Sequence, residues 1–283
     1  MIKTYIVAES GADLLKSDVE NNDIRIVPMH VTFDDACLDD GSFPVCKIFE
    51  YYNRTKQLPK TSATNPYEYR NIFEEILTET PDAHILHLGY SAVTTASFHN
   101  ALLAAEDYDN IIHIDTRNVS AGQRAIVMKM AQFIKENPSA TPHQLQETAE
   151  KLIDKCRFCF FPGNLEYLKA GGRVSNAAYL AASVLGIKPL IEIVDGKLVG
   201  AKKYRGSNEK VFVKFLEEYL AATKLEKDSF FMVYSEGLPV KTKAELEKVA
   251  AHFGYKDFVW VPTGCVISTH SGPGAFGVGG FIE

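Results

Sequence analysis

Short apolar runs alternate with segments of helical periodicity through the first half of the chain. Strands that alternate with helices are typical of a parallel sheet whose faces are covered by those helices. We therefore predict such a sheet here. Its strands are expected at Tyr5–Val7, Ile26–Val27, Ile85–Leu88 and Ile111–Ile114.

Two helix starts support this prediction. Ser120 can cap a helix that runs to Ile134, because a serine side chain accepts hydrogen bonds from the first free backbone N–H groups of a helix. Thr141 and Gln144 form a capping box around Pro142, which favours the first helical position. We expect ligands at the carboxyl ends of the strands.

Three polar side chains follow the predicted strands at that edge. They are Ser10, Ser91 and Asp115. Each is a candidate to contact a ligand, and each could instead cap a helix, which serine and aspartate do wherever a loop enters one.

The pattern changes after about Cys156. Asp195-Gly196 between two apolar runs indicates a hairpin, and further apolar runs enclose a helical segment at 244–253. We predict a second α/β domain with a mixed sheet, and domain limits of 1–156 and 157–283. The expected strands are 190–194, 198–202, 230–234 and 258–261.

The stretch 164–189 is expected to form two helices joined by a short elbow. Asn164 can cap the first helix, Gly171 can end it in the left-handed conformation, and Ser175 can cap a nearly all-apolar helix over 177–185. Arg173 then lies between two helix ends, where its guanidinium suits a carboxylate or a phosphate. A structural salt bridge is the alternative.

Near the end of the chain, His270 and Ser271 precede Gly272-Pro273-Gly274. Glycine and proline favour a tight turn. One hypothesis is that this turn sets His270 at a ligand pocket, and the alternative is turn chemistry alone.

Composition excludes several classes of function. The chain has 283 residues, of which 46% are hydrophobic and 23% charged. Its net charge is -6, so we expect it to lack the basic surface that nucleic acid requires. No apolar run has the length of a signal peptide or a membrane span, so we expect a cytoplasmic protein without stable membrane insertion.

Five cysteines argue against a disulfide scaffold. Cys156 and Cys159 form a C-x-x-C pair, but no second pair completes a zinc set, and residues three apart in a strand face opposite sides. We predict that both pack as small hydrophobic side chains, and we predict no metal site.

Seven ordered motifs resemble the DegV family of bacterial fatty-acid-binding proteins. They span nearly the whole chain, and the most specific are Gly-Gly-Arg after Leu-Glu-Tyr-Leu and the histidine before Gly-Pro-Gly. The motifs are TSATNP (61–66), YSAVTTASFHNA (90–101), IDTRNVSAG (114–122), LEYLKAGGRVS (165–175), LGIKPLIEIVDGKL (185–198), KKYRG (202–206) and THSGPGAFGV (269–278).

This resemblance implies a DegV-like two-domain fold, with a three-layer α/β/α domain beside a mixed-sheet α/β domain. It implies that one long-chain fatty acid binds in a tunnel between the domains. It also implies a separate fatty acid kinase subunit that phosphorylates the bound acid with ATP, giving an acyl phosphate for phospholipid synthesis. The chain would be a carrier without a cofactor and not an enzyme, in keeping with its lack of a P-loop.

The resemblance also assigns site residues by matching position. Thr61 matches the threonine that contacts the ligand carboxylate, followed by Ser62, and Arg173 and His270 match residues near the head group. The implied ligand contacts further include Ser91, Thr94, Thr95, Ala96 and Gly272, and the head-group or kinase-facing candidates are Ser10, Asp115 and Arg205.

The chain departs from the family pattern in two places. Ala96 replaces a glycine and Thr94 a leucine in the 91–97 stretch, and Ala8-Glu9-Ser10 replaces the usual Thr-Asp-Ser. Two other functions stay open: an enzyme that clamps a small anionic metabolite with Arg173 and uses His270 as acid or base, and a lipid sensor without a kinase.

Overall fold

A computed structural model describes residues 2–174 and 186–283. Its first sheet is parallel throughout, with the strand order β2-β1-β6-β7, so the predicted parallel sheet is confirmed. The strands are β1 (Thr4–Glu9), β2 (Arg25–Val27), β6 (His84–Gly89) and β7 (Ile111–Asp115).

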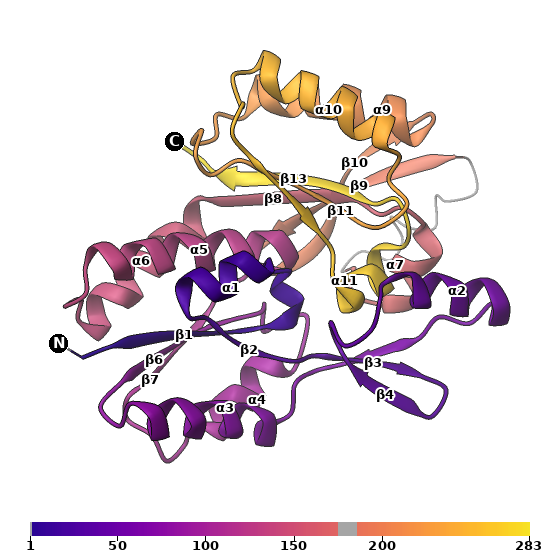
Figure 1. Ribbon diagram of the computed structural model, residues 1–283. Coiled ribbons are helices and arrows are strands. Elements are labelled where there is room, and N and C mark those ends of the chain that lie inside the picture. The colour runs from indigo at the N-terminus through magenta and orange to yellow at the C-terminus, as the bar shows by residue number, and fades with distance from the viewer. Residues whose placement is uncertain (1, 175–185) are drawn as a thin grey trace.

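Helices cover both faces of this sheet, which gives the predicted three-layer α/β/α arrangement (Figure 1). The helices on one face are α3 (Pro66–Glu79) and α4 (Ser97–Ala104), which pack on Tyr5, Val7 and Ile85. On the other face lie α1 (Lys16–Asn22), α5 (Ser120–Glu136) and α6 (Pro142–Lys155). A short 3-10 helix, η1 (Ser10–Ala12), connects β1 to α1.

The second sheet is mixed, as predicted, with the order β10-β9-β8-β13-β11-β12. Only β11 and β12 pair in parallel. Its strands are β8 (Cys156–Phe161), β9 (Ile187–Val194), β10 (Lys197–Arg205), β11 (Phe231–Tyr234), β12 (Val259–Pro262) and β13 (Phe276–Phe281), and its outer face carries α9 (Asn208–Ala222) and α10 (Val240–His252).

A third, antiparallel sheet has the order β4-β3-β5. Three short helices pack near it and contribute Ile48, Tyr167 and Val266 to a shared apolar cluster. The strands are β3 (His30–Phe33), β4 (Ala36–Asp39) and β5 (Lys60–Ser62), and the helices are α2 (Cys46–Thr55), α7 (Leu165–Gly171) and α11 (Cys265–Ser271).

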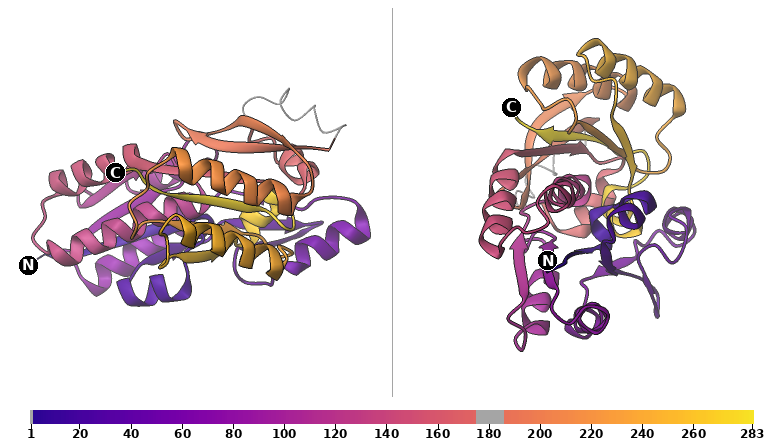
Figure 2. Two further views of the ribbon diagram at one scale, coloured as in Figure 1. Left: turned by 90° about the horizontal axis from the view of Figure 1, so that it is seen from above. Right: turned by 60° about the vertical axis from the view of Figure 1, so that its left-hand side comes forward.

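One continuous core connects the two large sheets. The α5 layer lies between them, and the right-hand view of Figure 2 shows this succession of layers from another side. Ile126 in α5 belongs to the same buried cluster as Leu86 in the parallel sheet and Phe158 in the mixed sheet. The two halves of the chain are therefore joined by shared apolar packing.

The helix boundaries confirm some predictions and correct others. Thr141 forms the predicted capping box, and Asn164 accepts from the backbone N–H of Glu166. Ser120 does not cap α5: Val119 is the N-cap, and the Ser120 hydroxyl donates to Asp13 instead.

Gly171 does not end α7 in the left-handed conformation. The glycine with positive φ is Gly172, at +65°, whereas Gly171 is the last helical residue. The predicted cap at Ser175 and the helix over 177–185 lie outside the described residues. The predicted Asp195-Gly196 hairpin is confirmed, since both residues have positive φ between paired β9 and β10.

The C-x-x-C cysteines are both buried and face opposite sides of the mixed sheet, as predicted. Cys156 packs in the cluster around α5, and Cys159 packs in the cluster under α9. Burial raises the pKa of the Cys156 thiol to about 12. Both side chains thus behave as small hydrophobes.

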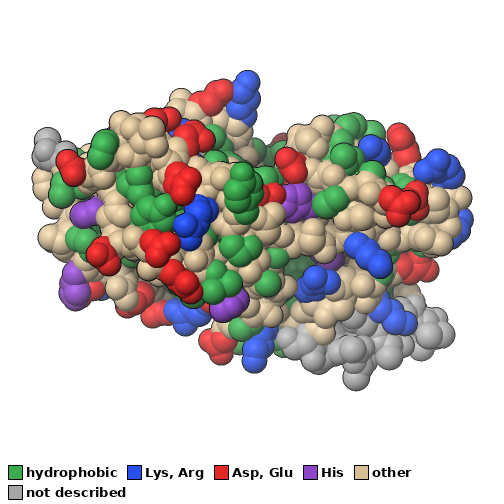
Figure 3. Space-filling model, turned by 90° about the horizontal axis from the view of Figure 1, so that it is seen from below, with side chains coloured by type: hydrophobic (Ala, Val, Ile, Leu, Met, Phe, Trp, Pro, Cys, Tyr) green, Lys and Arg blue, Asp and Glu red, His purple; other side chains and the backbone are tan. Residues whose placement is uncertain are grey.

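The surface mixes charges of both signs. On the face in Figure 3, lysine and arginine side chains are interspersed with aspartate and glutamate, without a broad basic field. Among the described helices, none is long and apolar enough to cross a membrane.

Candidate functional site

A cavity lies where the three sheets meet, and residues from both sides of position 156 line it. It encloses about 920 Å³ of empty space, part of which is open to solvent.

Most of the exposed cavity wall is apolar. Phe158 and Phe160 in β8 have stacked rings 5.9 Å apart, and the neighbouring strands add further apolar side chains. These are Leu198 in β10, Val233 in β11 and Phe276 in β13. Such a wall suits an extended hydrocarbon.

Six of the polar side chains that line the cavity belong to residues predicted above, and we call these six the polar rim. Their central contact joins Thr61 Oγ1 in β5 to His270 Nε2 in the last turn of α11, at 2.8 Å. Thr61 and His270 are both half-buried. The polar rim consists of Thr61, Ser62, Thr94, Thr95, Arg173 and His270.

His270 is held neutral by its surroundings. Burial, followed by the nearby positive charge of Arg173, lowers the pKa of the imidazole to about 4. Its Nδ1 atom has no hydrogen-bond partner among the described residues. A Cβ added at Gly171 would overlap this ring. The imidazole therefore packs against α7 only because residue 171 has no side chain.

The far end of α11 is fixed by two carboxyl groups, those of the buried Asp13 and the half-buried Asp40. Asp13 accepts from the backbone N–H of Gly264 at 2.7 Å, and Asp40 accepts from that of Cys265 at 2.7 Å. Burial raises the pKa of Asp13 to about 8. These contacts set the axis of the helix that carries His270.

Arg173 lies at the solvent side of the polar rim. Its side chain is exposed, and its guanidinium donates to the carbonyl of Gly171 at the end of α7. Its other N–H groups can donate hydrogen bonds to an anion in the cavity.

The loop after β6 supplies the remaining hydroxyls. Thr94 donates to the carbonyl of Ser91 at 2.9 Å, and the Thr95 hydroxyl lies 3.1 Å from that of Ser97. Asn100 in α4 donates to the carbonyl of Thr64, so this loop is tied to the segment that follows β5.

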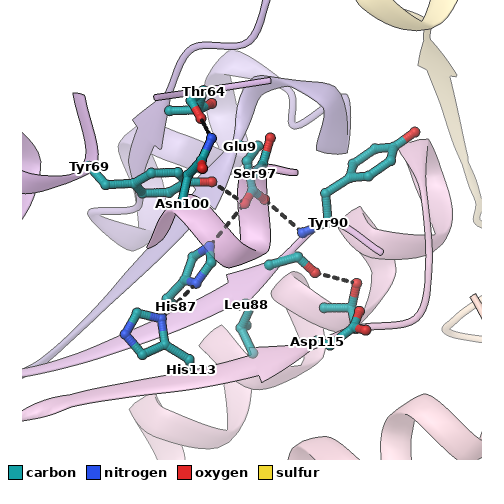
Figure 4. Close-up of polar contacts among 12 residues, drawn as sticks. Glu9, Thr64, Tyr69, His87, Leu88, Tyr90, Ser97, Asn100, His113 and Asp115 are labelled. Atoms are coloured by element: carbon teal, nitrogen blue, oxygen red, sulfur yellow. Dashed lines mark hydrogen bonds and ion pairs between the residues drawn. The ribbon is translucent and has the colours of Figure 1, made fainter. Parts of the chain in front are cut away.

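A buried hydrogen-bond network holds this loop from behind, centred on Glu9 at the end of β1 (Figure 4). One Glu9 oxygen accepts from Tyr69 at 2.5 Å and contacts His87 Nε2 at 2.9 Å. The other accepts from the backbone N–H of Tyr90 at 2.8 Å and from Gln123 at 2.9 Å.

Glu9 is ionised although neither it nor His87 is exposed. Burial raises the pKa of Glu9, but the adjacent His87 and the other donors outweigh burial and lower it to about 2. His87 Nδ1 lies 3.0 Å from His113 Nδ1, and burial lowers the pKa of His113 to about 3. The network thus anchors Tyr90, whose ring lines the cavity, to three strands of the parallel sheet.

The family model that matches residues 3–283 is that of the DegV family, described as uncharacterised proteins. The chain belongs to the DegV family. Among the relatives of this DegV chain, a Thermotoga maritima protein named fatty acid-binding protein is 26% identical, with 98% of this chain and 97% of that one covered.

Solved DegV structures share the fold. A fatty-acid-binding DegV protein from Thermus thermophilus superposes with a TM-score of 0.87 at 22% identity, covering all of both chains. A stearic acid-binding protein from Eubacterium ventriosum has a TM-score of 0.83 at 26% identity, covering 100% of this chain and 98% of that one.

The structure brings six of the predicted site residues of this DegV chain to the cavity, and these are the polar rim defined above. Ser91 lies behind it: its hydroxyl is buried and donates to the carbonyl of Gly196 at 2.7 Å. Ala96 is the exposed N-cap residue of α4 and does not line the cavity.

The other predicted residues also lie off the cavity wall. Ser10 accepts from the backbone N–H of Met29, and Asp115 accepts from those of Ala92 and Arg117. Arg205 is exposed at the end of β10.

Gly272 ends α11 with φ of +72°, beside Tyr167, and residues 273–274 form the expected turn. His270 itself lies in the last turn of α11, two residues before Gly272. The Gly-Pro-Gly segment therefore ends the helix that presents the histidine.

Several cavity residues were not predicted, including Tyr90, Ser120 and Tyr234. Tyr90 stands directly before the predicted Ser91. A signal for the network was present at Glu9, because an acidic residue closing an otherwise apolar buried strand needs internal partners. No spacing in the sequence connects Glu9 to Tyr69 or His87.

Proposed function

We propose that this chain binds a long-chain fatty acid in the cavity, with the carboxylate at the polar rim. The observation that carries the proposal is the Thr61–His270 hydrogen bond opening onto a predominantly apolar cavity. The proposal includes the domain limits 1–156 and 157–283, with the ligand between the two domains.

The alkyl tail supplies affinity. Burial of an alkyl chain gains roughly 0.8 kcal/mol per methylene, so ~14 methylenes gross about 11 kcal/mol before the cost of immobilisation. The wall formed by Phe158, Phe160 and Phe276 favours this ligand over a small polar metabolite, whose polar groups would lose their water there.

The polar rim supplies orientation. If the neutral imidazole of His270 donates from Nε2 to Thr61 Oγ1, the hydroxyl proton of Thr61 is free to donate to a carboxylate. Thr94, Thr95 and the exposed Arg173 provide further donors along the cavity wall. Charge-assisted hydrogen bonds of this kind offset the cost of desolvating a carboxylate.

A separate ATP-dependent fatty acid kinase subunit is the proposed partner. The chain has no glycine-rich phosphate loop of its own, in keeping with an ATP site on the partner. Arg173 beside the carboxylate would stabilise negative charge as the phosphoryl group arrives. In this proposal the chain is a cytoplasmic carrier that delivers acyl phosphate toward phospholipid synthesis.

The names of the relatives support the ligand. The Thermotoga maritima relative is named for fatty acid binding, and the Eubacterium ventriosum structure for stearic acid. Both are 26% identical to this chain over nearly its full length.

Native mass spectrometry of the protein purified from bacteria tests the ligand. We expect an added mass that corresponds to an acyl chain of more than about twelve carbons. The proposal would be overturned if the purified protein showed no added mass and also failed to bind added palmitate.

The kinase partner needs its own experiment. A pull-down should recover an ATP-binding subunit, and the two proteins together with ATP should form acyl phosphate. Lipid binding without either result would leave a lipid sensor in place of the carrier.

A further inference from the structure

A second cluster of polar side chains lies outside the cavity, and it consists of His30, Asp39 and Glu68. His30 Nε2 is 2.8 Å from Glu68 Oε1 and 3.4 Å from Asp39 Oδ1. One ligand atom from each residue lies within 4.8 Å of the other two. The three residues belong to β3, β4 and α3, so the fold and not a local turn brings them together.

The backbone positions each of these side chains independently. His30 and Asp39 are direct partners in the β3–β4 ladder, and directly opposed residues project from the same face of a sheet. Glu68 is in the first turn of α3, where its second oxygen accepts from the backbone N–H of Asn65 in a capping box. This leaves Glu68 Oε1 directed at His30.

The cluster is closed by protein on one side and open to water on the other. The His30 side chain is 11% exposed and that of Glu68 22%, whereas that of Asp39 is 60% exposed. An ion could therefore reach the cluster from solvent and meet a largely buried imidazole.

The charges of the cluster are unbalanced. Two carboxylates face one imidazole, and among the described residues no lysine or arginine forms an ion pair with Asp39 or Glu68. Elsewhere in the same half, Arg25 bridges the carboxylates of Glu75 and Glu79. A bound cation would balance the charges of Asp39 and Glu68, as Arg25 balances those of Glu75 and Glu79.

We propose that His30, Asp39 and Glu68 bind a divalent transition metal ion, with Zn²⁺ preferred and water in the remaining position. One imidazole nitrogen with carboxylate oxygens suits such ions, while Mg²⁺ and Ca²⁺ favour all-oxygen sites. Ligand bonds of about 2.0–2.2 Å place tetrahedral ligand atoms roughly 3.3–3.5 Å apart, which side-chain rotation can reach from the observed spacing.

The metal site lies on the opposite face of the small sheet from Thr61. Ser62 is opposite His30 in the β3–β5 ladder, while Thr61 is opposite Val31, so alternation directs Thr61 to the other face of the small sheet. The ion would join the β3–β4 hairpin to α3 and stabilise the support of Thr61 without touching a ligand in the cavity.

Isothermal titration of the full, chelator-stripped chain with ZnCl₂ tests this proposal. We expect saturable binding of one ion and a rise in the melting temperature, with weaker binding of MnCl₂ and none of MgCl₂ at equal concentration. His30→Gln keeps a donor toward Glu68, and Asp39→Asn changes an exposed group, so both variants should fold. Each should weaken Zn²⁺ binding at least about tenfold.

Two control variants exclude other zinc ligands. His143→Gln alters an exposed histidine that lies 3.7 Å from Glu147, and Cys37→Ser removes an exposed thiol on β4. Both should bind Zn²⁺ as the unaltered chain does. Absence of saturable binding, or binding that His30→Gln and Asp39→Asn leave unchanged, would overturn the proposal.

Discussion

The network around Glu9 and the polar rim around His270 both pair a histidine with oxygen, but they are satisfied to different degrees. Each Glu9 oxygen has two partners, and neither Glu9 nor His87 is exposed. Among the described residues, the His270 side chain forms one hydrogen bond, to Thr61, and its Nδ1 has no partner.

Tyr90 links the two regions. Its backbone N–H is bound by Glu9, and its side chain lines the same cavity as His270. The four hydrogen bonds to Glu9 fix the groups around it, while the single hydrogen bond between His270 and Thr61 can leave the Thr61 hydroxyl able to donate to a ligand. The comparison therefore separates scaffold from site and can be tested by mutation.

The largest effect is expected from Glu9→Ala. The variant leaves the buried side chains of Tyr69, His87 and Gln123 without their acceptor, and breaking a buried pair costs about 3–5 kcal/mol. Urea denaturation should show this loss in the free energy of unfolding. Glu20→Ala, which alters an exposed ion pair with Lys16, should change stability by less than about 0.5 kcal/mol.

A loss below about 1 kcal/mol in Glu9→Ala would contradict the assignment of this network as scaffold.

A smaller effect, on ligand binding instead of folding, is expected from Thr61→Val. The substitution keeps the shape of a β-branched strand residue and removes the hydroxyl. A hydrogen bond to a charged group contributes about 1.5–3 kcal/mol, so fatty acid affinity should fall about ten- to a hundredfold. Displacement of a fluorescent fatty acid measures this.

Thr32→Val is the matched control for that experiment. Thr32 lies in β3 opposite Lys60, one position along from the pair that contains Thr61, and so projects from the other face of the small sheet. The fatty acid affinity of Thr32→Val should equal that of the unaltered chain. Equal losses in both variants would remove the special role of Thr61.

The smallest effect concerns pH and His270. Its pKa is about 4 in the folded chain and about 6.5 when unfolded. Between these values the unfolded state binds more protons, so stability falls as pH falls. We expect a loss of about 1.5 kcal/mol between about pH 6.5 and pH 5 that His270→Asn abolishes.

The difference between the two chains isolates His270, because Asp13 and His113 titrate in both. A parallel pH dependence of the unaltered and His270→Asn chains would show that His270 is not desolvated in the ligand-free state.

The sequence predicted what depends on local patterns. Short apolar runs identified the parallel strands and the strands β9, β10, β11 and β12 of the mixed sheet, and capping residues located the starts of α6 and α7. The glycine-rich strand β13 was not predicted. Motif resemblance placed Thr61 and His270, 209 residues apart, in one site, and they form a hydrogen bond.

Contacts between residues far apart in the chain could not be predicted from local patterns. Two adjacent glycines do not indicate which of them takes positive φ, and the Ser120 hydroxyl donates to the buried Asp13, far away in the sequence, and does not cap the helix. The third sheet also escaped prediction, since β3, β4 and β5 have only three or four residues each. Strands so short carry little periodicity.

The placement of α5 between the two large sheets has a consequence for ligand exchange. Residues of α5 and of both sheets share one buried core, so the halves cannot swing apart as hinged lobes without exposing it to water. A molecule held in the cavity must therefore come and go by local rearrangement at the rim, with the body of the protein remaining closed around the path.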